Sequence, residues 1–413
     1  MRTRYPLWIA FVIVHAVVIV LSLVGTGNPL VDVTDVYLPW ARDAVEGRGV
    51  VGIQEQWVYP VLALAPILFA LAGGAAHYAM TWLVLVTALD AVAFAILVGR
   101  GTSRRRRAAA WWWLAFLAAL GPIALDRLDA VTVPLSVCAV LVVLRRPRTA
   151  AALLAVATWI KVWPAAILAA AVIAVRSRVR ILLAAAALSV AVVAVVLALG
   201  GGAYVLGFLT LQTGRGLQVE APISLIYLWQ AAVGVDGASV SFDEQIVTFQ
   251  VTGAGVEGVI ALMTPLLVAS LATVAVLGGL AVRAGAPIAR VLPTLSLALV
   301  LVLIAVNKVG SPQYLTWLVA PVVLGIVWRG TRYRVPAAAV LVLAFLTHVV
   351  YPYLYALLRD AALPLVAVIT VRNVGFFVVL AWCVVELLRA RRAAPARRIP
   401  ADRIDSTVAS RRI

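Results

Sequence analysis

Long apolar runs separated by short, mostly basic stretches dominate the chain. A helix needs about 20 apolar residues to cross the hydrocarbon core of a bilayer, and clusters of Arg mark the helix ends that face the cytoplasm. With the N-terminus inside, the pattern predicts spans at about 7–24, 78–99, 109–125, 130–144, 181–199, 257–281, 291–306, 314–328, 336–350 and 364–388.

Residues 58–73 are a short apolar stretch that contains Pro60 and Pro66. If this stretch crossed the membrane, the four arginines at 104–107 would lie outside, against the positive-inside rule. Proline also interrupts a regular helix. We therefore expect 58–73 to be an interfacial or re-entrant helix on the outer side.

Residues 149–175 are too few for two full crossings, yet Arg148 and Arg176 bracket them on the same side. We expect two short helices that meet at residues 161–164, because broken helices occur where backbone lines a cavity. With these two, the chain has about 12 transmembrane segments, and both termini are cytoplasmic.

This topology divides the chain into one transmembrane domain and a tail. The domain is expected at 1–388, with a long first extracytoplasmic loop at 26–77 and a second large one at 200–256. Residues 389–413 are rich in Arg, Ala and Pro, and we expect a disordered, basic cytoplasmic tail in contact with membrane lipids.

Composition supports an all-α polytopic membrane protein of the plasma membrane. Hydrophobic residues make up 64% of the chain and charged residues 12%, whereas soluble domains carry about 25% charged residues. A net charge of +17 would suggest nucleic acid in a soluble protein. Here most basic residues mark cytoplasmic loops, so no nucleic-acid partner is expected. No P-loop, HExxH or CxxC motif occurs, and we expect no metal and no cofactor.

Two carboxylates, Asp32 and Asp35, follow the first span and precede Tyr37 and Trp40. A carboxylate at this point can act as general base on a hydroxyl, and the rings suit a sugar face. The alternative is an ordinary acidic loop with interfacial aromatic residues.

Eight basic residues fall outside the cytoplasmic loops, and they include both lysines of the chain. Lys161 lies in an apolar stretch with no adjacent acid, so its ammonium needs an anion such as a phosphate unless it reaches the interface. Arg215 stands between two glycines, where it either binds a ligand or pairs with Glu220. We expect an outward anion pocket from Arg127, Lys161, Arg215, Lys308 and Arg372.

In these motifs the chain resembles the GT-C-type membrane glycosyltransferases, most closely glycosyltransferase family 87, the polyprenyl-phosphomannose-dependent α-mannosyltransferase-like proteins of actinobacteria. The resemblance covers about residues 8–388. The matching residues are Asp35-Val36-Tyr37 with Trp40-Ala41, Tyr59-Pro60, Arg127-Leu128-Asp129, Lys161 with Pro164, Gly214-Arg215-Gly216-Leu217-Gln218-Val219-Glu220 and Ser311-Pro312-Gln313-Tyr314.

The resemblance implies a GT-C fold and transfer of a sugar, with inversion, from a polyprenyl-phosphate-sugar donor to a hydroxyl of a glycolipid or glycan acceptor on the outer face. A first-loop aspartate is the base. The shorter spacing before Tyr37 leaves Asp32 and Asp35 as alternatives, and we favour Asp35. Lys161, Arg215, Lys308 and Arg127 would bind the donor phosphate. The substrate-binding residues would be Tyr37, Trp40, Tyr59, Asp129, Glu220, Gln313, Tyr314 and His348.

Two other functions stay open at the level of sequence. A transporter or flippase of a lipid-linked saccharide also suits many segments with a broken helix. A ligase that uses a lipid-pyrophosphate donor would share the basic pocket.

Overall fold

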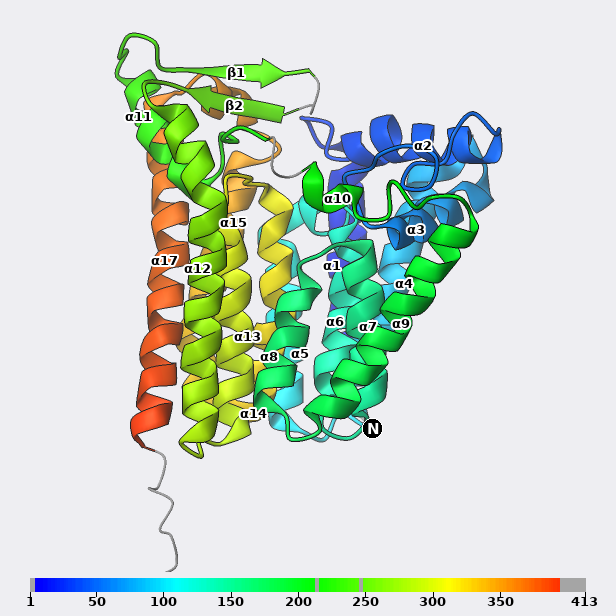
Figure 1. Cartoon of the computed structure of the whole chain (residues 1–413), viewed down its shortest axis with the longest axis vertical. Helices are drawn as coiled ribbons and strands as arrows, with labels where there is room; N and C mark the ends of the chain where they lie inside the picture. The colour runs from blue at the N-terminus through cyan, green and yellow to red at the C-terminus, as the bar shows by residue number, and fades with distance from the viewer. Residues whose placement is uncertain (1–3, 212–214, 245–247, 394–413) are drawn as a thin grey trace, which may run out of the picture.

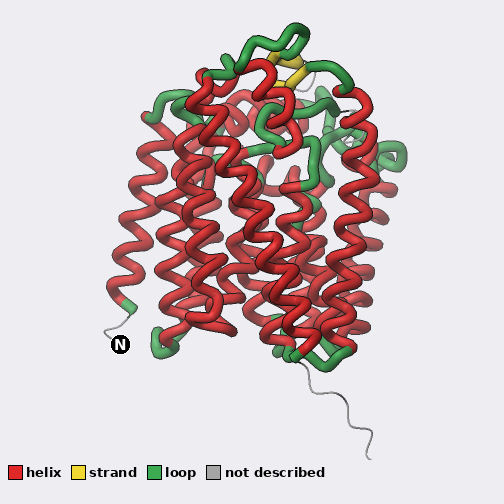
Figure 2. Tube along the Cα trace, turned by 90° about the vertical axis from the view of Figure 1, so that its left-hand side faces the viewer, coloured by secondary structure: helices red, strands yellow, loops and turns green. Residues whose placement is uncertain are grey.

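The computed structural model describes residues 4–211, 215–244 and 248–393, and most of these residues are helical. The helices lie side by side in one bundle, and the longer loops and both strands gather at one end of it (Figures 1 and 2). We call this end the upper face and the opposite end the lower face. Both ends of the described chain lie at the lower face (Figure 1).

The chain is an all-α membrane protein. Within the described residues, eight helical stretches are long and apolar enough to cross a membrane. One of them, Pro312–Val350, contains two helices. The eight stretches are Tyr5–Val24, Ala75–Val98, Arg104–Ala124, Arg178–Ala198, Val256–Arg283, Ile288–Ala305, Pro312–Val350 and Leu363–Arg392.

The long helices lie close to the predicted spans. They are α1 (Tyr5–Val24), α4 (Tyr78–Val98), α5 (Arg104–Leu120), α9 (Arg178–Ala198), α12 (Val256–Arg283), α13 (Ile288–Ala305), α15 (Arg334–Val350) and α17 (Leu363–Arg392). The span expected at 314–328 is found as a 3₁₀ segment followed by the short helix α14 (Val319–Arg329).

Helices α5 and α17 also differ from their predicted spans. Helix α5 begins five residues early, because Ser103 accepts a hydrogen bond from the Arg106 N–H (3.4 Å) and caps an arginine-rich first turn. Helix α17 continues to Arg392, so a tail that begins at 389 is wrong for its first residues. The rest of the expected tail, 394–413, lies outside the described residues.

Three helices are too short to cross a bilayer alone: α6 (Asp129–Val142), α7 (Pro147–Ile160) and α8 (Pro164–Ala174). The predicted break between α7 and α8 is confirmed. Lys161 adopts an extended backbone, with φ −154° and ψ 136°, and Pro164 stands at the start of α8. Pro164 lacks an N–H and suits the first turn of a helix, so α8 begins here as a separate helix. The break leaves Lys161 between two helix ends.

The upper face carries short elements that cover the bundle. The expected short helix occurs as Val61–Gly73, which contains α3 (Leu64–Ala70). Strands β1 (Ser239–Asp243) and β2 (Thr248–Thr252) pair antiparallel, a hairpin that the all-helical prediction missed. Further short helices here are the π-helix Asp32–Tyr37, α2 (Leu38–Val45), α10 (Gly207–Thr210), α11 (Leu225–Ala232), α16 (Tyr355–Arg359) and several 3₁₀ segments, among them Gly121–Ala124 and Pro312–Leu318.

Helix α13 forms the centre of the bundle and is buried along most of its length. Helices α9 and α12 lie at the periphery and expose apolar side chains, as expected of helices that contact lipid.

At the lower face, Glu386 of α17 pairs with Arg329 (2.8 Å), Arg290 (3.6 Å) and Arg389 (3.5 Å). Arg105 at the start of α5 donates to the carbonyl of Trp328 (2.9 Å). The arginine-rich loops therefore gather at one end, as the predicted topology requires.

Candidate functional site

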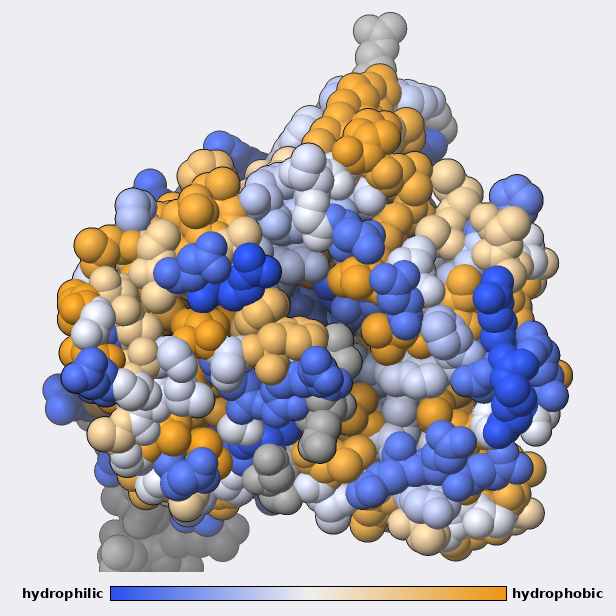
Figure 3. Space-filling view, turned by 90° about the horizontal axis from the view of Figure 1, so that it is seen from above, coloured by the Kyte–Doolittle hydropathy of each residue, from blue (hydrophilic) through white to orange (hydrophobic). Residues whose placement is uncertain are grey.

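The candidate site lies at the upper face, where polar side chains meet from segments far apart in sequence. It is formed by the π-helix after α1, the turn before α6, the break between α7 and α8, and the loops at 215–221 and 306–314. Seen from above, this face is hollowed near its middle, and hydrophilic residues lie in the hollow (Figure 3).

Asp32 and Arg127 form the first part of the site. Arg127 Nε lies 2.8 Å from Asp32 Oδ2, and its Nη2 donates to the Tyr351 hydroxyl (2.8 Å). Nη1 donates to the carbonyls of Pro29 (2.7 Å) and Asp126 (2.8 Å). Each nitrogen of the buried Arg127 guanidinium thus has a partner within the protein, whereas the Asp32 side chain is 30% exposed. Asp32 is accessible to a substrate and Arg127 holds it in place.

Lys161 and Asp129 form the second part. Lys161 Nζ donates to Asp129 Oδ2 (2.6 Å), and the indole N–H of Trp317 donates to the other carboxylate oxygen. The expectation that Lys161 lacks an acidic partner is therefore wrong. Asp129 is distant in sequence, but the first turn of α6 faces the break between α7 and α8. The positive charge of Lys161 is therefore compensated by Asp129, and Lys161 is not an unpaired cation at the site.

Aromatic rings surround this ion pair. Lys161 Nζ lies 5.5 Å from the ring centre of Tyr59 and 5.8 Å from that of Tyr314. Tyr314 stacks on Trp317 at 4.0 Å between ring centres. Sequence reasoning missed Trp317, although its position three residues after Tyr314 places both on one side of a 3₁₀ helix.

The predicted aromatic residues of the first loop join the same cluster. Trp40 lies 6.0 Å from Tyr37 and 6.1 Å from Tyr59 between ring centres. Burial raises the pKa of Tyr59 well above its usual value, and the carboxylates of Asp32 and Asp129 add to the rise. Both ion pairs thus lie near the phenol of Tyr59.

Arg215 and Lys308 form the third part of the site. The loops that carry them are joined by a hydrogen bond from the Gln218 N–H to the Lys308 carbonyl (3.0 Å). Burial lowers the pKa of Lys308, and the nearby Arg215 lowers it further. In the described part of the chain, the buried Nε of Arg215 has no hydrogen-bond partner. Two cations therefore lie close together here, and Arg215 retains an unused donor.

Glu220 binds a different arginine from the one considered in the sequence. Arg372 of α17 lies 2.8 Å from Glu220 Oε2 and also donates to the Glu220 carbonyl (2.8 Å). The alternative in which Arg215 pairs with Glu220 is therefore wrong. The predicted place of Arg372 in an anion pocket is also wrong, because Glu220 compensates its charge. The pair fixes the loop at 215–221 onto α17, and this leaves Arg215 as the loop's remaining cation.

Three predicted residues stand apart from these contacts. Asp35 is exposed on the π-helix, without an ion pair in the described residues. Gln313 is buried, and its carbonyl accepts a hydrogen bond from Thr316 (2.7 Å). The ring of His348 contacts Ala119, Gly121 and Tyr353 rather than the clusters above. Of the two alternative bases, only Asp32 lies within the cluster.

Asp126 is fully buried behind Arg127. Ser22 Oγ donates to its Oδ1 (2.9 Å), while Oδ2 has no partner in the described residues. Burial raises the pKa of Asp126 to about 7, an effect that Arg127 and the Ser22 hydrogen bond oppose. A carboxyl group adjacent to the Asp32–Arg127 pair therefore changes charge near neutral pH.

This pKa predicts a pH-dependent stability that Asp126→Asn removes. The folded chain keeps a proton that the unfolded chain releases above about pH 4. The raised pKa therefore contributes stability at low pH, which is lost as pH rises towards 7. In detergent, the thermal unfolding midpoint of the wild type should fall between pH 5 and pH 7 more steeply than that of Asp126→Asn. Parallel pH profiles of the two proteins would contradict this prediction.

No three His, Cys, Asp or Glu side chains among the described residues gather as metal ligands would. In comparisons with known proteins, no family model, no curated protein and no solved structure matches the chain.

Proposed function

We propose that the protein is a membrane glycosyltransferase that moves a sugar, with mannose as the first candidate, from a polyprenyl-phosphate donor to a hydroxyl of a cell-envelope glycolipid or glycan. The motif resemblance described above supports this proposal. The observation that carries it is the combination of one accessible carboxylate, Asp32, with two cations at the same face, the partly buried Arg215 and the buried Lys308.

The proposal includes the membrane arrangement. The chain has a GT-C fold with about 12 membrane segments, counting the short helices α6, α7 and α8 and separating α14 from α15. It lies in the plasma membrane with both termini in the cytoplasm. The upper face is extracytoplasmic, and the arginine-rich lower face supports this orientation through the positive-inside rule.

In the proposed reaction, Asp32 removes the proton from the acceptor hydroxyl as that oxygen attacks the anomeric carbon. The bond from this carbon to the phosphate oxygen breaks on the opposite face, so the configuration inverts and polyprenyl phosphate leaves. Arg215 and Lys308 offset the negative charge that develops on the leaving phosphate. Tyr59, Tyr314 and Trp40 supply ring faces for the sugar.

Tyr351 lies between the proposed base and the proposed cations. Arg127 donates a hydrogen bond to the Tyr351 hydroxyl and forms an ion pair with Asp32. Burial raises the pKa of Tyr351, Arg127 opposes the rise, and Asp32 and Glu220 add to it. Glu220 belongs to the loop of Arg215, and Gly310 abuts the Glu220–Ala221 backbone so closely that a Cβ there would lie 2.3 Å from the Ala221 nitrogen. Asp32 and the loop that carries Arg215 thus lie on opposite sides of Tyr351, close enough for both carboxylates to affect it.

Purified protein supplied with radiolabelled polyprenyl-phosphomannose and an envelope glycolipid extract tests the proposal. Release of polyprenyl phosphate, matched by label in the glycolipid, is the expected result. Cleavage that occurs only with a polyprenyl-pyrophosphate sugar would instead assign a ligase.

The broken helix pair α7–α8, with a charged residue at the break, favours a transporter as second candidate. Proteoliposomes loaded with the same donor distinguish it. Movement of intact donor across the membrane, without cleavage, would replace the transferase by a transporter.

Arg215→Gln should raise the KM for the donor by roughly 10- to 100-fold, because a charge-assisted hydrogen bond contributes about 1.5–3 kcal/mol. Steady-state kinetics with varied donor concentration measure the effect. Arg42→Gln is the matched control, because Arg42 is exposed and carries the same charge in the first loop. Equal KM values for the two variants would exclude Arg215 from donor binding.

A further inference from the structure

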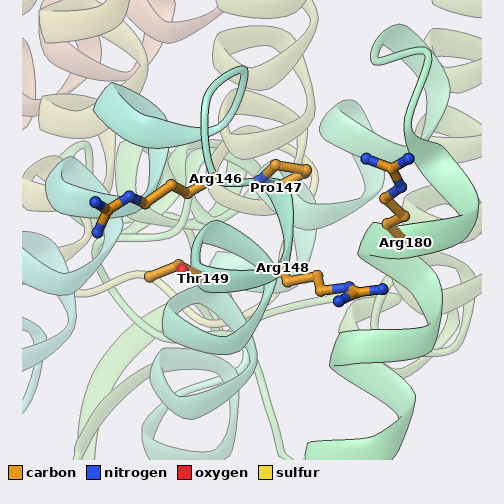
Figure 4. A pocket seen from close by; sticks show the side chains of 5 residues that line it. All are labelled: Arg146, Pro147, Arg148, Thr149 and Arg180. Atoms are coloured by element: carbon orange, nitrogen blue, oxygen red, sulfur yellow. The ribbon is translucent and has the colours of Figure 1, made fainter.

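A cavity of about 230 Å³ opens at the lower face, where helices α7 and α9 begin, and it is lined by Arg146, Pro147, Arg148, Thr149 and Arg180 (Figure 4). Arg148 extends toward the helix that carries Arg180, whereas Arg146 extends away on the other side of Pro147 (Figure 4). Three of the five lining residues are arginines, and none is acidic. The cavity therefore presents concentrated positive charge.

These arginines differ from others at the same face. Arg105, Arg106 and Arg107 of α5 donate to backbone carbonyls. In the described part of the chain, the cavity arginines form no ion pair and no side-chain hydrogen bond, and all three are exposed. Their donors are therefore accessible to a group outside the protein.

The backbone adds to the positive charge. Helices α7 and α9 both begin at this cavity, and neither has an acidic residue in its first turn or a side-chain cap. A helix N-terminus carries unpaired N–H groups and a partial positive charge, so arginines are unfavourable there unless an anion is present. Two such ends meet here, and an anion in the cavity would compensate both.

The cavity lies at the border of the lipid-facing surface. Leu144, Val179, Leu182 and Leu183 lie next to its arginines in sequence and are 50%, 61%, 51% and 66% exposed. Apolar side chains so exposed on a membrane protein contact acyl chains. An anion at this position would have a hydrophobic tail within reach of α9.

We propose that this cavity binds the phosphate of an anionic phospholipid headgroup in the leaflet at the lower face. Arg148 and Arg180 contact the phosphate from two helices, the backbone N–H groups of Arg148 and Thr149 contribute donors, and the acyl chains lie along α9. The site lies at the end of the bundle opposite Asp32. It is independent of the proposed transfer reaction.

Native mass spectrometry of the full chain in a neutral detergent tests the proposal with phosphatidylglycerol as probe. Each arginine near an anionic lipid surface contributes about fivefold in affinity, so Arg148→Gln/Arg180→Gln should weaken binding by roughly 25-fold. Arg391→Gln/Arg392→Gln is the matched control, because it removes the same charge from exposed residues at the same face. Its affinity should stay close to that of the wild type.

Three results would overturn the proposal. Equal weakening in both double variants, or equal binding of phosphatidylcholine, would show general attraction to the surface rather than a site. Inorganic phosphate that displaces the lipid and binds as tightly alone would assign the cavity to a free phosphate instead. The variant Arg148→Lys/Arg180→Lys keeps the charge and should retain most of the binding, which distinguishes lost charge from altered folding.

Discussion

Asp32→Asn is expected to lower the rate of sugar transfer by about 10²- to 10⁴-fold, the usual contribution of a general base. The amide oxygen of Asn can still accept a hydrogen bond from Arg127, so the local structure should persist. The proton of the acceptor hydroxyl, however, would have no base within the cluster. Turnover measured with saturating donor, together with donor affinity measured separately, checks the prediction.

Asp35→Asn is the matched control for this experiment. The two aspartates lie on one π-helix, three residues apart, but Asp35 is exposed and outside the cluster. Its substitution should leave turnover within about twofold. The reverse pattern, with Asp35→Asn inactive and Asp32→Asn active, would return the role of base to the residue that the sequence favoured.

Asp129→Asn is expected to lower the free energy of unfolding by about 3–5 kcal/mol, because it leaves the ammonium of Lys161 mostly buried without its counter-charge. Removal of both charges in Asp129→Asn/Lys161→Met should recover most of this loss. Equilibrium unfolding in mixed detergent micelles of increasing SDS content measures both variants.

Asp43→Asn provides the comparison for a surface pair. Asp43 and Arg48 are 43% and 55% exposed, and an exposed pair contributes at most about 1 kcal/mol. If Asp129→Asn costs no more than Asp43→Asn, the Asp129–Lys161 pair is not the buried element that its geometry indicates.

Local features of the sequence predicted most of the helices. The span expected at 78–99 is found at Tyr78–Val98, and the expected break is found at Lys161, just before the proline that begins α8. These features depend on neighbouring residues only. The number of membrane segments is harder to read, because α6, α7 and α8 are shorter than a bilayer is thick.

Long-range pairing could not be predicted from one sequence. Lys161 has no acid nearby in the chain, and its partner Asp129 is supplied by the packing of α6 against α7. Glu220 had a plausible partner in Arg215 five residues away, yet Arg372 binds it from the last helix. Residue type and apolar context indicated that these residues need partners. Only the fold determines which partners they obtain.

Helix α17 carries one charged residue toward each end, and each forms an ion pair with residues of opposite charge from earlier segments of the chain. Its Arg372 neutralises Glu220 near the upper face, and its Glu386 neutralises Arg290 and Arg329 at the lower face. Because synthesis proceeds from the N-terminus, those partners lack these counter-charges until α17 enters the bundle. An inverted or misplaced α17 would leave both groups uncompensated, so the insertion of α17 is selected for one orientation and one depth by the charges that precede it.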